Sequence, residues 1–237
     1  MNKQILIVKN ITREGPGLLG QVLDRQQIGY AIADLSQGEP VPDPLQFDAL
    51  IILGGPQSAN DKSPLMRQEI DMAYRALQAG LPCLGICLGL QVLAKAAGGR
   101  VIACPVKETG FFDHEGNPFR VILTGEGSRD PLFKNLNERF RVFQLHGETV
   151  ETSGSMMLLA SGKHCRNQVV RVGARAYGLQ CHFELTAVML EEWARFDPDL
   201  HTTGIDTLMK QFSSVREEYT QTGLSLMTNF LKIAEIA

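Results

Sequence analysis

The sequence lacks the features that mark several large classes of protein. No apolar run approaches the roughly 18 residues of a membrane span, and no Cys-x-x-Cys pair suggests a metal site. No Gly-x-x-x-x-Gly-Lys loop is present to hold a nucleotide phosphate. Charge of one sign is not in excess either, since 23 basic and 26 acidic residues give a formal net charge of −3. These absences argue against membrane, nucleic-acid and ATP-binding roles and favour small molecules or proteins as partners.

Cysteines are few and odd in number, which argues against a disulfide framework. We expect free thiols in a reducing compartment, and hence a cytoplasmic protein. Cys87 stands apart for reasons given below, and we interpret the other four as packing residues: Cys83, Cys104, Cys165 and Cys181. The apolar run within residues 1–10 is too short for a signal peptide and is typical of a first strand.

The 237 residues suffice for one large domain, or one domain with an appendage. Up to residue 99 the chain alternates short apolar segments with helical patterns. This alternation predicts an α/β fold, a mostly parallel open sheet covered by helices on both faces. We predict strands at 4–8, 30–35, 48–53 and 81–86, and helices at 16–27, 64–78 and 88–97.

Beyond residue 99 the pattern changes to short β-rich segments separated by Gly, Asn, Asp and Ser, which predicts added antiparallel strands. These lie at 100–103, 119–123, 139–144, 156–160, 168–172 and 174–183. Helical patterns return at 186–195 and 204–236. We predict one domain over residues 1–190 and a C-terminal helical extension over 191–237, packed on that domain or at a subunit interface.

Residues 81–99 predict a strand, one sharp turn and a helix, with Cys87 in the turn. Gly85 and Gly89, two residues on either side, leave room for a strained turn of the nucleophile-elbow type. The first amides of the following helix favour a thiolate at Cys87. The alternative is that Cys87 is a small buried apolar residue, which is the commoner role of free cysteine.

A thiolate nucleophile needs a base and a group that orients the base. Residues 178–184 are typical of a strand, and residues two apart on a strand face the same side, so His182 and Glu184 can share a cleft. An imidazole held by a carboxylate can protonate a leaving amine and then activate water. His146 is the rival base, whereas His114, His164 and His201 lack an acid two residues later.

Three motifs together resemble the class I glutamine amidotransferases, the triad glutaminases, which have a flavodoxin-like fold. They are the segments 85–91 (GICLGLQ), 54–56 (GGP) and 180–184 (QCHFE). The resemblance extends over residues 2–190, and is greatest to stand-alone proteins similar to the glutaminase domain of GMP synthase. It implies that Cys87 is the nucleophile, His182 the acid and base, and Glu184 its orienting group. Phe183 departs from the family, which usually has proline there, so a backbone restraint is lost.

The resemblance assigns further roles. The backbone amides of Gly55 and Leu88 are the expected donors to an oxyanion, and Gln91 lies one helical turn after the nucleophile, where its amide can bind substrate. Leu145 and His146 occupy positions that recognise substrate largely through backbone groups. We expect no cofactor and no metal. The alternative for Gln91 is an ordinary surface glutamine on a helix.

The leading hypothesis is an enzyme that cleaves the γ-amide of glutamine through a cysteine thioester and passes ammonia to an unknown acceptor. A separate synthetase subunit and a homo-oligomer are possible partners. One alternative is a γ-glutamyl peptide hydrolase that uses the same triad. The other is a catalytically weak regulatory or binding subunit, suggested by Phe183 and the terminal helices.

Overall fold

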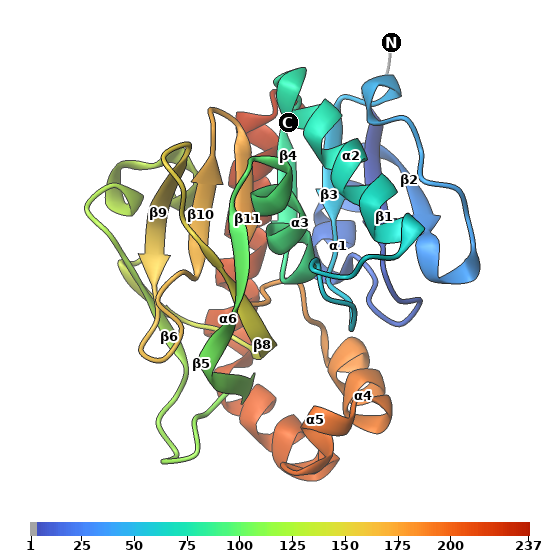
Figure 1. Cartoon of the computed structure of the whole chain (residues 1–237). Helices are drawn as coiled ribbons and strands as arrows, with labels where there is room; N and C mark the ends of the chain where they lie inside the picture. The colour runs from blue at the N-terminus through green and yellow to red at the C-terminus, as the bar shows by residue number, and fades with distance from the viewer. Residues whose placement is uncertain (1–3) are drawn as a thin grey trace.

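The computed structural model describes residues 4–237, so the part of the N-terminal prediction that concerns residues 1–3 lies outside it. A nine-stranded sheet, in the order β2-β1-β3-β4-β11-β10-β9-β6-β7, forms the centre of the described chain. A separate pair of strands, β5 and β8, lies beside it (Figure 1). The predicted α/β architecture is confirmed.

One half of the large sheet is parallel, from β2 through β11. The four inner strands β1, β3, β4 and β11 are mostly buried apolar runs, as expected for strands covered on both faces, whereas the edge strand β2 is partly exposed. Their bounds are Gln4–Lys9 (β1), Gly29–Asp34 (β2), Ala49–Ile52 (β3), Cys83–Ile86 (β4) and Ala176–Leu179 (β11).

The other half is antiparallel and comes from the β-rich middle of the chain. Its strands are Arg120–Leu123 (β6), Arg139–Arg141 (β7), Met156–Ser161 (β9) and Val169–Val172 (β10). The separate antiparallel pair consists of Arg100–Gly110 (β5) and Gln144–Glu151 (β8), with an irregularity in the register between Ala103 and Glu108.

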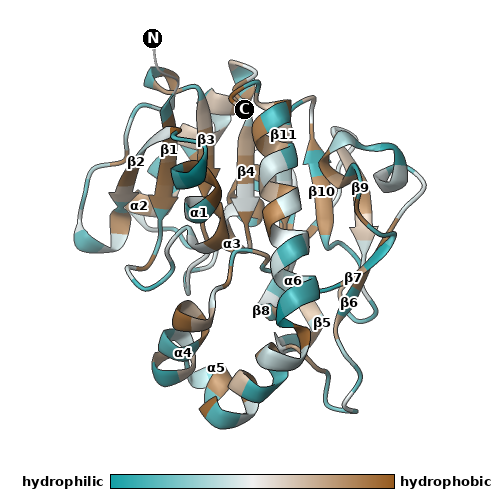
Figure 2. Ribbon diagram, turned by 180° about the vertical axis from the view of Figure 1, so that it is seen from behind, coloured by the Kyte–Doolittle hydropathy of each residue, from teal (hydrophilic) through white to brown (hydrophobic). Residues whose placement is uncertain are grey.

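Two helices cover each face of the large sheet (Figures 1 and 2). Helices α1 (Gly17–Arg25) and α6 (Ile205–Ile233) pack on one face, and α2 (Pro64–Gln78) and α3 (Leu88–Ala96) on the other. The short helices α4 (Ala187–Phe196) and α5 (Pro198–His201) lie beyond the carboxyl ends of the parallel strands. The remaining elements are short 3₁₀ turns at Leu35–Gln37, Pro44–Gln46, Gly127–Arg129 and Pro131–Phe133.

Local signals explain where two of these helices begin. Ser63 caps α2 by accepting a hydrogen bond from the amide of Met66, and Pro64 occupies the first turn, where its missing N–H costs nothing. Thr186 caps α4 in the same way through the amide of Met189. The predicted helices therefore start within one or two residues of their observed positions.

Three predicted strands were wrong in extent, and the one expected at 100–103 continues as β5 to Gly110. The segment 139–144 is not one strand, because β7 pairs with β6 in the large sheet whereas β8 leaves to pair with β5. The segment 174–183 is a strand only to Leu179, after which the chain leaves the sheet. His182 then forms a single bridge with Phe143.

Helix α6 belongs to the same core as the sheet, since Leu226, Met227, Phe230 and Leu231 are buried with residues of β1, α1 and β11. The division at residue 190 stays a prediction. Over residues 4–237, no helix has both the length and the apolar character needed to cross a membrane.

Candidate active site

Cys87 lies in the sharp turn that joins β4 to α3. Its backbone has φ 53° and ψ −106°, a left-handed conformation that is strained for any residue with a side chain. Its amide donates to the carbonyl oxygen of Leu179 on the neighbouring strand β11, at 2.7 Å. The turn is thereby held in place from outside the elbow segment.

The two flanking glycines permit the close packing of this turn. A Cβ atom at Gly89 would lie 2.0 Å from the carbonyl oxygen of Ile52, and one at Gly85 would lie 2.4 Å from the backbone of Gly89. Since these neighbours are backbone atoms, no side chain can move aside to make room. The glycines are required because α3 rests directly on β3 and β4.

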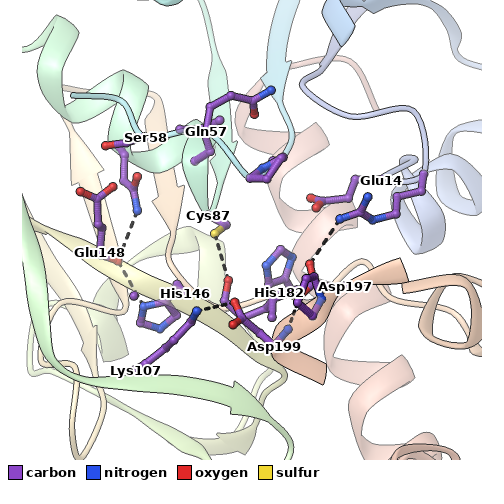
Figure 3. A pocket seen from close by; sticks show the side chains of 18 residues that line it. Glu14, Gln57, Ser58, Cys87, Lys107, His146, Glu148, His182, Asp197 and Asp199 are labelled. Atoms are coloured by element: carbon purple, nitrogen blue, oxygen red, sulfur yellow. Dashed lines mark hydrogen bonds and ion pairs between the residues drawn. The ribbon is translucent and has the colours of Figure 1, made fainter. Parts of the chain in front are cut away.

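The Cys87 side chain is nearly buried, at 7 % exposure, but lines a cavity of about 320 Å³. Its thiol lies 3.6 Å from the carbonyl oxygen of Leu145 on β8 (Figure 3). The side-chain amide of Gln180 lies 3.7 Å from the sulfur. The thiol is thus nearly buried and yet faces a cavity, and the choice between a nucleophile and a packing residue stays a prediction.

His182 and Glu184 meet as a buried pair. Nδ1 of His182 lies 2.6 Å from Oε1 of Glu184, and the other carboxylate oxygen accepts from the amide of Phe183 at 2.9 Å. Nε2 of His182 is buried and has no hydrogen-bond partner among the described residues. The carboxylate thus fixes the tautomer and leaves Nε2 available on the cavity side.

The expectation that residues 178–184 form a strand was wrong beyond Leu179, although His182 and Glu184 still face each other. Helix α6 holds this loop instead: the hydroxyl of Tyr219 donates to the carbonyl of His182 at 2.9 Å and accepts from the amide of Leu185 at 3.3 Å. The His182 ring packs edge-on against Phe143 and Trp193, with ring centroids at 6.1 and 5.1 Å.

These contacts hold the backbone on both sides of position 183, where the resemblance leads one to expect proline. The Phe183 ring is buried in the core, 5.5 Å from Phe140 between centroids, and its backbone N–H orients Glu184. A proline has no N–H and cannot make that bond. In place of a proline ring, the buried Phe183 side chain and its N–H bond to Glu184 hold this part of the loop.

The electrostatics of the pair favour an imidazolium. Burial alone lowers the pKa of His182, but the charge and hydrogen bond of Glu184, together with Cys87, outweigh it and leave the pKa of His182 well above its usual value. A histidine that stays protonated beside a thiol can stabilise the thiolate and hold a proton for a leaving group.

The loop after β3 carries the GGP motif, residues 54–56, and lies at the same cavity as Cys87 and His182. A Cβ atom at Gly54 would lie 3.3 Å from Cε1 of His182 and 3.5 Å from Cβ of Cys87, so this glycine touches both. Gln57 fixes the loop by donating to the carbonyl of Asn10 at 2.9 Å. The carboxyl ends of β1, β3, β4 and β11 therefore meet at one cavity, as is usual in α/β sheets.

Glu14 is a site residue that sequence reasoning missed. It is buried at the start of the turn into α1, and its carboxyl points into the cavity that Cys87 and His182 line (Figure 3). Oε2 has no partner among the described residues and lies 2.4 Å from where a Cβ of Gly54 would be. Burial raises the pKa of Glu14 to about 7, with His182 opposing and Glu184 adding to the rise. Its place after the first strand was the signal that could have identified it.

The predicted site residues come together. Seven of them line one cavity, with Glu184 behind His182; these are Gly55, Cys87, Leu88, Gln91, Leu145, His146 and His182. Gln91 is buried rather than on the surface, and its side chain donates to the carbonyl of Glu148 at 3.2 Å. The ring nitrogens of His146 contact Cys104, Glu108, Gln144 and Glu148 rather than Cys87.

The turn before α5 closes one side of the cavity. Asp197 pairs with Arg13 at 3.3 Å, and Asp199 pairs with Lys107 (Figure 3). Both acidic residues line the cavity, so its charges are largely compensated within the protein. The volume and the mixed polarity suit a small polar molecule.

A comparison with protein families identifies the family of the chain. Residues 27–190, more than half of the chain, match the model described as "Glutamine amidotransferase class-I". The chain belongs to the class I glutamine amidotransferase family. The resemblance inferred from three short motifs is thus confirmed at the level of the family.

Curated relatives of the amidotransferase differ in length and name. The glutamine amidotransferase-like protein YfeJ of Salmonella typhimurium is 32% identical over 171 residues, 69% of each chain. A GMP synthase of Aliivibrio fischeri is 30% identical over 142 residues, 59% of this chain but 24% of its own length. A γ-glutamyl-L-1-hydroxyisopropylamide hydrolase of a Pseudomonas species is 29% identical over 158 residues, 63% of this chain and 52% of its own. The chain spans about a quarter of that GMP synthase.

Solved structures show the same fold over the whole chain. A glutamine amidotransferase from Thermotoga maritima has a TM-score of 0.85 at 25% identity, with 99% of both chains covered. One from Methylobacillus flagellatus has a TM-score of 0.83 at 23% identity, covering 98% of this chain and 96% of its own. The likeness includes the C-terminal helices, which lie beyond the region matched by the family model.

Proposed function

We propose that this amidotransferase hydrolyses the γ-amide bond of glutamine with a Cys87, His182 and Glu184 triad. The observation that carries the proposal is the unpartnered Nε2 of His182, which is buried at a cavity shared with Cys87 while Glu184 holds Nδ1 at 2.6 Å. A nucleophile, a base and an orienting carboxylate in this order are what covalent amide cleavage needs.

The proposed reaction has two steps. The Cys87 thiolate attacks the γ-carbonyl carbon, and the C–N bond breaks as His182 donates its proton to the leaving nitrogen, which gives ammonia and a thioester. His182 then removes a proton from water, the hydroxide attacks the thioester, and glutamate leaves as the thiolate is restored. The protons balance, since His182 gives one and recovers one.

Two backbone amides are the proposed oxyanion donors. Leu88 is the first residue of α3, so its amide has no partner within the helix, and Gly55 lies across the same cavity. The crowding at Gly55 supports a position where only glycine fits, because a Cβ there would lie 2.5 Å from Cβ of Asn10. Gln91, Leu145 and His146 are the proposed substrate contacts.

A second candidate is hydrolysis of γ-glutamyl amides other than glutamine. The observation that favours it is the 29% identity to a hydrolase whose name specifies a γ-glutamyl hydroxyisopropylamide, over 63% of this chain. The same triad serves either substrate, because only the leaving amine differs. Passage of ammonia to a synthetase subunit, homo-oligomerisation and a cytoplasmic location are also proposals; the five free cysteines support the last.

A substrate panel on the purified chain separates the candidates. We expect release of ammonia from glutamine with wild-type protein and a loss of about a thousandfold or more in Cys87→Ser. Faster turnover of γ-glutamyl alkylamides than of glutamine would favour the second candidate. Full activity in Cys87→Ser would contradict the triad.

Labelling distinguishes an enzyme from a regulatory subunit. A glutamine-like electrophile should add once to native protein, at Cys87, as read by intact mass and peptide mapping. Cys83→Ser is the matched control, because its hydroxyl can keep the bond that the Cys83 thiol makes to the carbonyl of Leu81. Failure of wild type to label while it remains folded would favour the regulatory alternative.

A further inference from the structure

Three side chains outside the triad form a cluster of soft ligand atoms. The sulfur atoms of Cys104 and Cys165 and a ring nitrogen of His146 all lie within 4.8 Å of one another. They come from three elements: the irregular middle of β5, strand β8, and the turn between β9 and β10. Cys165 and His146 are buried, at 1 % and 5 % exposure, and Cys104 is partly exposed.

The separation of two of these atoms fits a tetrahedral metal site. Sγ of Cys104 lies 3.5 Å from Nδ1 of His146. In a tetrahedral zinc site with Zn–S near 2.3 Å and Zn–N near 2.0–2.1 Å, sulfur and nitrogen ligands are about 3.5 Å apart. Between Ala103 and Glu108, β5 departs from its regular pairing with β8, so Cys104 lies outside the regular hydrogen-bond ladder. The earlier interpretation of Cys104 as a packing residue does not agree with its partial exposure.

The opposite nitrogen of His146 is held as it is in metal-bound histidines. Nε2 lies 3.0 Å from Oε2 of Glu108 and 3.1 Å from Oε1 of Gln144, and Gln168 donates to the same Glu108 oxygen at 3.0 Å. With Nε2–H donating to these oxygens, the lone pair of a neutral imidazole is on Nδ1, on the side of Cys104. The carbonyl of Glu148, 3.2 Å from Nδ1, is the competing partner if that nitrogen is protonated.

We propose that Cys104, His146 and Cys165 bind a divalent cation of the zinc type, with solvent as the fourth ligand. Two sulfurs and one imidazole nitrogen select such a cation over magnesium or calcium, which prefer oxygen. Both thiols release their protons to solvent on binding. The Cys165 thiol gives up its hydrogen bond to the hydroxyl of Thr149, at 3.2 Å.

The position of the cluster gives the cation a route to influence the active site. His146 lines the cavity, and Leu145, its neighbour on β8, contacts the Cys87 thiol through its carbonyl oxygen. A cation that ties β8 to β5 and to the turn at Cys165 fixes this wall of the cavity. The binding itself does not depend on which amide the triad cleaves.

Titration of the full chain with cobalt(II) tests the proposal. Chelator-treated, reduced protein should bind one equivalent and develop thiolate-to-cobalt charge-transfer absorption, which zinc should then abolish by displacement. Cys104→Ser and Cys165→Ser should each weaken zinc binding by at least about 100-fold, and Glu108→Gln, which keeps every ligand, by about 10- to 100-fold. Cys83→Ser, a matched exchange outside the cluster, should bind as wild type does.

Two results would contradict the proposed metal site. One is binding by Cys104→Ser and Cys165→Ser with wild-type stoichiometry and affinity. The other is no binding by folded, reduced wild-type protein. If the unreduced protein also has a mass lower by two hydrogens, with a bond mapped between Cys104 and Cys165, the pair is an oxidisable dithiol instead. Circular dichroism of each variant separates lost binding from lost folding.

Discussion

The two sides of the active site are built by different means. On the side of Cys87, a short segment between β4 and α3 is fixed by backbone packing, with Gly85 and Gly89 in contact with main-chain atoms. On the side of His182, the chain has left the sheet, and side chains distant in sequence hold it. Tyr219 bonds to it from 37 residues away, and Phe143 and Trp193 pack against the imidazole.

Because of this difference, the two sides should respond differently to mutation. At the elbow, any added Cβ meets backbone that cannot yield, so the constraint is steric. At the histidine loop, we expect removal of the Tyr219 hydroxyl to leave the fold in place but to allow His182 to shift. We therefore expect mutations on the first side to affect stability most and those on the second to affect turnover.

The largest effect is expected for Gly89→Ala. Its Cβ would lie 2.0 Å from the carbonyl oxygen of Ile52, so α3 and β3 must separate. We expect a loss of about 3 kcal/mol in the free energy of unfolding, measured by chemical denaturation. Gly154→Ala, where nothing lies within 4 Å of the added atom, is the control. Equal stability of the two variants would mean that the elbow is not sterically fixed.

Tyr219→Phe should be next in size. It leaves the carbonyl of His182 and the amide of Leu185 without their buried partner, at a cost of about 1–3 kcal/mol. Displacement of the base should lower kcat for amide hydrolysis by roughly tenfold to a hundredfold. Tyr177→Phe, the same exchange at a hydroxyl beside Arg171 and Asp130, should cost stability but not kcat. Unchanged kcat in Tyr219→Phe would show that the loop does not need α6.

Glu14→Gln tests a buried carboxyl group that lies next to Gly54 and interacts electrostatically with His182. The carboxyl has a pKa of about 7 in the folded chain against 4.5 as its ordinary value. Below pH 4.5 it is neutral in both states and costs nothing; above pH 7 its ionisation destabilises the folded state by about 3 kcal/mol. Wild type should therefore lose stability from pH 4.5 to 7 more steeply than Glu14→Gln, as measured by denaturation across that range.

The pH profile of hydrolysis provides the control for Glu14. Ionised Glu14 attracts the His182 imidazolium, so removal of the Glu14 charge should lower the pKa of His182. The limb of the pH–rate profile that reports the ionisation of His182 should then move to lower pH. Glu69, also buried with its pKa raised to about 7, contacts Asn10 rather than His182. Glu69→Gln should flatten the stability curve in the same way and leave the activity profile unmoved. Identical pH profiles of hydrolysis for Glu14→Gln and Glu69→Gln would show that Glu14 does not influence His182.

The smallest effect is expected for Gln91→Met, which removes a proposed substrate contact on the Cys87 side and a bond from that side to β8. Gln91 on α3 donates to the carbonyl of Glu148 on β8 at 3.2 Å. Because Gln91 is a proposed substrate contact, loss of one hydrogen bond to the substrate corresponds to about 0.5–1.5 kcal/mol, and KM should rise roughly threefold to tenfold with kcat nearly constant. Lys95→Met, one turn further along α3 and bonded to Asn60, should leave KM unchanged. A fall in kcat alone would contradict a binding role.

The sequence by itself determined the parallel half and the elbow. Strands and helices there follow from short-range patterns, and Gly85 and Gly89 lie close enough to Cys87 for spacing to reveal the turn. Motif order was sufficient to predict the family and to select residues that line one cavity. Their catalytic and binding roles stay predictions.

Only the tertiary structure decided what surrounds those residues. Tyr219, Glu14 and the cluster of Cys104, His146 and Cys165 have no fixed spacing from the residues they contact, since each meets them through a different strand, turn or helix. Strand β8 was missed for the same reason, because its partner β5 lies about forty residues earlier and its half-buried pattern is irregular. Contacts between segments distant in the chain depend on how sheets and helices pack, which a local pattern does not encode.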